Sequence, residues 1–306
     1  MNTTRLLEEY HREGLVIVRG VLSDAEVKAA IDDTFDAVLN MPWIDEERET
    51  WRTISGIIKI DPFAPVSRSI VKLAKAHYPE MGGFAALTRS PSFHTKEMWK
   101  ARQNLQLIDL HRAIYNLPTP TPTTHDTVYD DICVNFDRIS FKFPGQGDTE
   151  FCHWDSNPFT WGNNPELTQG FLALTHTTFR GVPRTHTDAF RNEFVRVYPH
   201  SDRPDQYHVY ADHDPLKLLE RVEDYHLAPG DYVIWSNRLL HEARKNKRDT
   251  IRIGYYLSYA PRAMPASCAL NDAYRKASIT LEDDRRRSFA QGRPTSVVLS
   301  LSRVVL

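Results

Sequence analysis

The sequence predicts a mainly β fold with flanking helices, in which short strands form a sandwich or a jelly-roll barrel. Beyond Asp126, many short apolar or alternating runs are separated by Pro and Gly turns, which is typical of such folds. Before that point, apolar residues recur mainly with helical spacing. With 306 residues, 41% of them hydrophobic, the chain is long enough to bury a sizeable core.

The N-terminal part predicts helix, strand and helix in that order. A helix is expected over residues 3–12, and Gly14 then releases the chain into the β-branched run Leu15–Val18, which indicates a buried strand. Ser23 and Glu26 have the spacing of a capping box, so a second helix is expected to begin there.

The strands of the second half follow one another closely. They are expected over residues 138–143, 149–153, 170–177, 193–198, 225–227, 231–235 and 250–259, with a short helix over 215–222.

These elements indicate a single domain, residues 1–306, with three parts. Residues 1–117 form an N-terminal strand and helical layer, residues 128–262 the jelly-roll core, and residues 263–306 a C-terminal extension with a helix expected near 271–276. The Pro- and Thr-rich stretch 117–124 cannot continue a helix and is interpreted as an exposed connector.

Composition argues against several classes of protein. A formal net charge of −2 lacks the basic excess that a phosphate backbone requires, so nucleic acid is not expected as a partner. Three cysteines without a C-x-x-C pair argue against a disulfide framework or a structural zinc site. No apolar run approaches the roughly 18 residues of a membrane span, and no signal segment is visible. We therefore expect a cytoplasmic protein without a membrane partner; the sequence does not predict its oligomeric state.

His153 and Asp155 stand two residues apart, directly after a run predicted to be a strand. Both side chains can leave the same face of the strand end, where an imidazole and a carboxylate supply half of a metal site. Two further His-x-Asp triplets begin at His186 and His200, so the triplet alone is weak evidence.

His241 is the candidate for the second imidazole. It follows the tight turn Pro229–Asp231 and the strand predicted after it. Because a jelly-roll brings such strands beside each other, His241 can complete a site of two histidines and one carboxylate.

Arg252 lies within the strand predicted over residues 250–259. An arginine there is costly to bury unless it holds an anion, and its planar group can grip a carboxylate through two hydrogen bonds. An arginine on an edge strand that reaches solvent is the alternative interpretation.

A longer series of motifs, taken together, resembles the pattern of a known protein family. In chain order it comprises Gly14–Leu22, Lys142–Gly145, His153-Trp154-Asp155, Trp161, the loop Val182–His186, Pro229–Asp231, His241, Arg252 and Tyr259–Pro261. In this order the chain resembles the Fe(II)/2-oxoglutarate-dependent oxygenases, specifically the phytanoyl-CoA dioxygenase-like group, over about residues 8–40 and 134–261. It departs from that pattern at Trp154, where the group usually has Gln, and at Arg184-Thr185, which replace a Gly-Ser pair.

The resemblance implies a double-stranded β-helix (jelly-roll, cupin-like) core in which His153, Asp155 and His241 bind iron and Arg252 binds the distal carboxylate of 2-oxoglutarate. It implies a dioxygenase that uses O2 to decarboxylate 2-oxoglutarate to succinate while it oxidises, most commonly hydroxylates, a small organic substrate, with ascorbate as reductant. Asp155 favours oxygenation over halogenation, whereas desaturation, ring closure and epimerisation stay open.

Four further residues are weaker candidates. Lys142 shares its strand face with Arg138 and is either a cosubstrate contact or a solvated lysine; Thr250 and Tyr256 are candidates for hydrogen bonds near Arg252, Tyr256 also for the substrate pocket. Trp161 is either a wall of that pocket or part of the core. Trp154 is expected to point away from the site, because side chains alternate along a strand.

Two other functions remain open at this stage. A jelly-roll protein can keep the fold and bind a ligand without catalysis, and a zinc-dependent hydrolase can use the same three ligands. A small-molecule substrate is favoured by the acidic balance and by the helical layer of residues 41–117, which is expected to cap the barrel mouth.

Overall fold

The computed structural model describes residues 2–39, 63–77, 95–118, 131–135, 139–146, 151–163, 165–201, 206–262 and 278–280. Most of the expected connector 117–124, Arg138, Asp202 and the helix expected near residues 271–276 lie outside these ranges.

Two antiparallel five-stranded sheets form the core, and they confirm the predicted jelly-roll. The first has the order β1 (Leu15–Val18), β9 (Tyr232–Ser236), β5 (Thr168–Ala173), β11 (Arg252–Tyr256) and β3 (Ile139–Lys142). The second has the order β7 (Tyr207–Val209), β4 (Phe151–Trp154), β10 (Leu240–Ala243), β6 (Thr177–Val182) and β8 (Glu223–Leu227). A smaller sheet joins β12 (Tyr259–Pro261), β2 (Ile132–Asn135) and β13 (Ser278–Thr280).

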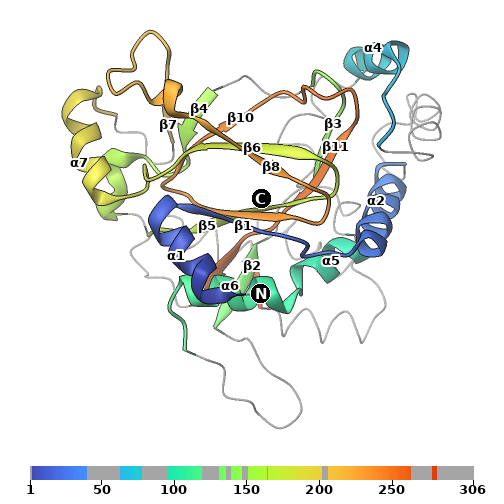
Figure 1. Ribbon diagram of the computed structural model, residues 1–306, viewed down its shortest axis with the longest axis horizontal. Coiled ribbons are helices and arrows are strands. Elements are labelled where there is room, and N and C mark those ends of the chain that lie inside the picture. Colours follow the sequence, from blue (N-terminus) through green and yellow to red (C-terminus); the bar gives the residue numbers. More distant parts are fainter. Residues whose placement is uncertain are drawn as a thin grey trace, which may run out of the picture.

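The helices lie around these sheets (Figure 1). They are α1 (Thr3–Glu13), α2 (Asp24–Leu39), α4 (Arg68–His77), α5 (Lys96–Arg102), α6 (Leu105–Ile114) and α7 (Asp188–Val197), with short 3-10 turns η2 (Pro158–Asn163) and η3 (Leu218–Arg221). Among the described residues, no helix is both long and apolar enough to cross a membrane.

The N-terminal elements form where the sequence predicts them. Gly14 ends α1 with φ +82°, and its N–H donates to the carbonyl of Tyr10. Side-chain and backbone groups of Ser23 and Glu26 bond reciprocally, as a capping box requires, at the start of α2. The strand between these helices pairs with β9, so the N-terminal segment completes the first sheet.

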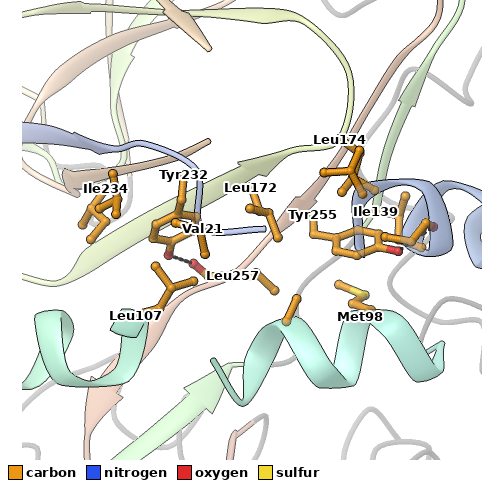
Figure 2. Packing of buried hydrophobic residues seen from close by; sticks show 14 of the residues in the cluster. Val21, Met98, Leu107, Ile139, Leu172, Leu174, Tyr232, Ile234, Tyr255 and Leu257 are labelled. Carbon is orange, nitrogen blue, oxygen red and sulfur yellow. Dashed lines mark hydrogen bonds between the residues drawn. The ribbon is translucent and has the colours of Figure 1, made fainter. Parts of the chain in front are cut away.

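Helices α5 and α6 cover the outer face of the first sheet. Met98 of α5 and Leu107 of α6 pack in one cluster with Leu172, Tyr232 and Tyr255 of the strands, all of them buried (Figure 2). Odd-numbered and even-numbered residues of a strand face opposite sides, so Arg252 and Tyr256 point away from this cluster. The expectation that the helical layer caps the barrel mouth is therefore wrong for α5 and α6.

Three local predictions also differ from the structure. Residues 193–198, expected as a strand, are mostly the last turns of α7, because Phe190 and Phe194 have helical spacing and Thr187 caps the helix by accepting the N–H of Phe190. The helix expected over 215–222 is reduced to η3. The strand expected over 250–259 divides into β11 and β12.

Candidate metal centre

Strand pairing brings the two candidate histidines together. β4 lies antiparallel to β10, and His153 stands directly opposite His241 in this ladder. His241 lies inside β10, where the strand order fixes its position. Asp155 follows the last residue of β4.

The three side chains converge on one point. The Nε2 atom of His153 lies 3.3 Å from Oδ1 of Asp155, and the Nε2 atom of His241 lies 3.4 Å from Oδ2 of the same carboxylate. One potential ligand atom from each residue lies within 4.8 Å of the others. This is the spacing that a single metal ion requires of three protein ligands, and it leaves further coordination positions to other groups.

The protonation of the cluster also suits a cation. Burial raises the pKa of Asp155, but the hydrogen bond with His153 and the favourable electrostatic interaction with both histidines outweigh it, so the pKa is well below its usual range. Burial, and then repulsion from His153, lowers the pKa of His241 to about 4. The Nδ1–H of His241 donates to the carbonyl of Leu239 at 3.0 Å, so Nε2 keeps its lone pair for a metal. A carboxylate and a neutral imidazole are the forms that bind metal ions.

The other two triplets do not join this cluster. His186 lies beside Gly14 and its Nε2 contacts the carbonyl of His11 at 3.2 Å. His200 packs edge-on against Phe159.

A cavity of about 420 Å³ lies between the two sheets and contains the cluster. Lys142 and Arg252 line it from the first sheet, where they stand directly opposite each other on β3 and β11. Lys142 is only 3% exposed, so its interpretation as a solvated lysine is wrong. The cavity thus carries a three-residue cluster on one sheet and two cationic side chains on the other.

Aromatic side chains form much of the remaining wall. Phe171 and Tyr256 come from the first sheet and touch each other edge-on, with ring centroids 5.1 Å apart. Trp235 and Phe179 also line the cavity, and Phe179 stacks on His241. Tyr256, a candidate for the substrate pocket, is among the residues that line this cavity.

Trp161 was interpreted either as a pocket wall or as core, and Thr250 as a candidate for a hydrogen bond near Arg252. Neither residue lines the cavity. Trp161 is buried in a separate cluster behind the second sheet, because its Nε1–H donates to the carbonyl of Ser156 and turns the ring away. Thr250 stands before β11, and its carbonyl accepts a hydrogen bond from Asn246.

Trp154 points away from the cavity, as alternation along the strand predicts. It is fully buried against Phe190, Phe194 and Tyr207 on the outer face of the second sheet. This packing fixes β4, and with it His153, from behind.

Three polar residues near the cluster were not among the candidates that the sequence indicates. Gln169 and Gln206 line the cavity, and His208 stands opposite His153 on β7. Gln169 shares its strand face with Phe171, so alternation could have indicated it. Gln206 and His208 gave no signal, because they follow a polar connection.

Comparisons with known proteins find similar chains and similar folds. "Ava biosynthesis cluster protein O" from Aspergillus versicolor is 23% identical over 283 residues, which cover 86% of this chain and 79% of that protein. The fold is similar to the non-heme alpha ketoglutarate dependent epimerase SnoN from nogalamycin biosynthesis, with a TM-score of 0.50, 14% identity and coverage of 89% and 87% of the two chains. EvdO2 from Micromonospora carbonacea var. aurantiaca, complexed with 2-oxoglutarate, has a TM-score of 0.44 at 17% identity over 86% of this chain and 92% of that chain.

A family match covers most of the chain. Residues 10–254 match the family described as Phytanoyl-CoA dioxygenase (PhyH), and they include the three clustered residues together with Lys142 and Arg252. The protein therefore belongs to the phytanoyl-CoA dioxygenase family of non-haem iron enzymes, which use Fe(II), 2-oxoglutarate and O2.

Proposed function

We propose that this protein oxidises, most simply by hydroxylation, a small organic substrate while 2-oxoglutarate is converted to succinate and carbon dioxide, and that His153, Asp155 and His241 hold the iron. One observation carries the proposal: this cluster faces Arg252 and Lys142 across the same cavity.

The two cations suit the cosubstrate. 2-Oxoglutarate has a carboxylate at each end, so one end can reach the metal cluster while the distal carboxylate lies against Arg252 and Lys142. The guanidinium group of Arg252 can bind that carboxylate through two hydrogen bonds, and the ammonium group of Lys142 adds a second positive charge. Bound Fe(II) would supply the redox chemistry by which oxygen is activated.

The aromatic wall favours a small organic substrate. Phe171, Phe179 and Trp235 offer apolar surface beside the cluster, and a cavity of about 420 Å³ lies within the range of small-molecule sites. Such a wall binds carbon skeletons and excludes water from the reacting groups.

The test begins with the protein freed of metal and then supplied with Fe(II), ascorbate and 2-oxoglutarate. We expect slow formation of succinate even without substrate, abolished in His153→Ala. The matched control is His176→Ala, because His176 is an exposed histidine in the turn between β5 and β6.

A metabolite screen for faster succinate release then identifies the substrate, and the mass of the product shows whether an oxygen atom has been added. The proposal is overturned if the wild type neither binds iron nor forms succinate. Tight zinc binding with oxygen-independent turnover would support the hydrolase instead, and ligand binding without any turnover would support the non-catalytic protein.

A further inference from the structure

We infer that Gln206 is a positioning residue, which holds the carboxylate of Asp155 in the orientation for metal binding and is itself oriented by His208. The inference rests on the proposed function, because it assigns Asp155 to the metal. Gln206 precedes β7 and is half-buried beside the cluster.

The hydrogen bonds have only one consistent direction. The Nε2 atom of Gln206 lies 3.2 Å from Oδ1 of Asp155, and its Oε1 lies 3.2 Å from Nε2 of His208. An ionised carboxylate can only accept hydrogen bonds, so the amide nitrogen of Gln206 must face Asp155. The amide oxygen then faces His208, whose Nε2 must carry the hydrogen.

The backbone and a ring contact hold His208 in place. His208 stands opposite His153 in the ladder between β7 and β4. Its ring is stacked on Phe151, with the centroids 4.8 Å apart and the planes 12° from parallel. A rigid imidazole is therefore available to fix the amide of Gln206, and through it the plane of the Asp155 carboxylate.

A second amide reaches Asp155 from the opposite sheet. Gln169 of β5 hydrogen-bonds the carboxylate, and its Oε1 is buried without a hydrogen-bond partner among the described residues. The free oxygen fits an orientation in which the NH2 group faces Asp155. Asp155 is thus held between Gln206 and Gln169, one from each side of the cavity.

This arrangement matters because Asp155 is the only one of the three clustered residues that lies outside a strand. The carboxylate follows the end of β4, where no ladder fixes its backbone. Partners in the outer shell of a metal site orient the ligands, and their loss typically weakens metal binding about tenfold to a hundredfold.

The test is a titration of the metal-free protein with Co(II), followed by the visible absorption of the bound ion. Gln206→Met keeps the length of the side chain and removes both polar atoms, so we expect a Kd for Co(II) about 10 to 100 times higher and an altered spectrum. Gln106→Met is the matched control, since Gln106 is exposed on α6 and should bind Co(II) as the wild type does.

His208→Phe provides a second, independent variant. It keeps a ring to stack on Phe151 but removes the donor to Gln206, so we expect a smaller loss of affinity in the same direction. Thermal unfolding of each metal-free variant shows whether the fold is intact. If Gln206→Met does not fold, His208→Phe decides the question.

Two outcomes overturn the inference. If the wild type binds Co(II) and the folded variants bind it with the same Kd and spectrum, Gln206 does not position Asp155, and the proposed function stands. A wild type that binds no Co(II) overturns the inference and the proposed metal site together.

Discussion

Arg252 and Lys142 occupy directly opposed positions on neighbouring antiparallel strands. Both side chains line the cavity that contains the cluster of His153, Asp155 and His241. Like charges in one cavity repel each other, and the repulsion increases where burial removes water. A carboxylate bound between them relieves it.

Removal of either charge should weaken 2-oxoglutarate binding more than metal binding. A hydrogen bond to a charged group contributes about 1.5–3 kcal/mol, so we expect Arg252→Gln to raise the KM for 2-oxoglutarate roughly 10- to 100-fold. Lys142→Met should raise it less, because an ammonium group does not bind a carboxylate as a planar fork does. Succinate assays measure KM, and the Kd for Co(II) should stay near that of the wild type.

Arg248→Gln is the control for this pair, since Arg248 is exposed beyond β10. An unchanged KM in both Arg252→Gln and Lys142→Met would contradict a cosubstrate role for the two cations.

Gly254 should not tolerate a side chain, because Phe171 of the adjacent strand lies over it. A Cβ atom at this position would stand 2.1 Å from Cζ of Phe171 and 2.7 Å from the carbonyl oxygen of Leu172. We expect Gly254→Ala to lower the free energy of unfolding by about 1–3 kcal/mol, as overpacking does. Urea denaturation measures the change.

Gly162→Ala is the comparison, since nothing lies within 4 Å of the Cβ it would introduce. Phe171→Leu shortens the obstructing ring, so the double variant should lose less stability than the sum of the two single changes. Strict additivity would show that the clash with Phe171 is not the cause.

His111 should make stability depend on pH. It is fully buried, with Nδ1 2.8 Å from Oγ1 of Thr168 and Nε2 3.1 Å from the hydroxyl of Tyr232. Burial lowers its pKa to about 3, so between that value and the ordinary histidine pKa near 6.5 only the unfolded chain takes up the proton. The contribution of His111 is therefore complete above pH 6.5 and is lost as the pH falls, by about 2 kcal/mol at pH 5.

The measurement compares the wild type with His111→Gln from pH 7 to pH 5. The difference in unfolding free energy between them should shrink as the pH falls, because glutamine does not titrate. For His176→Gln, which changes an exposed residue, the unfolding free energy should depend on pH as it does in the wild type. If the unfolding free energy of His111→Gln also shows the pH dependence of the wild type, His111 is not the cause of that dependence.

The convergence of His153, Asp155 and His241 was predictable, because strand alternation and the order of the strands together bring the three side chains to one place. His153 and Asp155 are close in sequence, and a jelly-roll brings back a later strand that carries His241. Alternation also separates the inward side chains of β4 from Trp154, which packs outside. The same alternation along β11 predicts that the side chain of Arg252 points into the cavity.

The remaining contacts depend on side-chain hydrogen bonds and on the pairing of distant strands, neither of which can be predicted from the periodicity of the sequence. The choice between pocket wall and core for Trp161 depends on the hydrogen bond from its ring to the carbonyl of Ser156. Thr250 lies outside the cavity, and β11 begins only after it. Gln206 and His208 come beside Asp155 and His153 through the pairing of β7 with β4, which is non-local. A short polar run does not reveal its partner strand.

The metal cluster and the two cations stand on different sheets, so no hydrogen-bonded ladder fixes the distance between them. That distance depends instead on the side chains packed between the sheets, among them Phe171, Leu227 and Trp235. In the binding mode proposed above, the hydrophobic core thereby sets which chain length of dicarboxylic acid can reach from one sheet to the other. Selection among oxo acids would then depend on the volume of the side chains packed between the sheets as much as on charge.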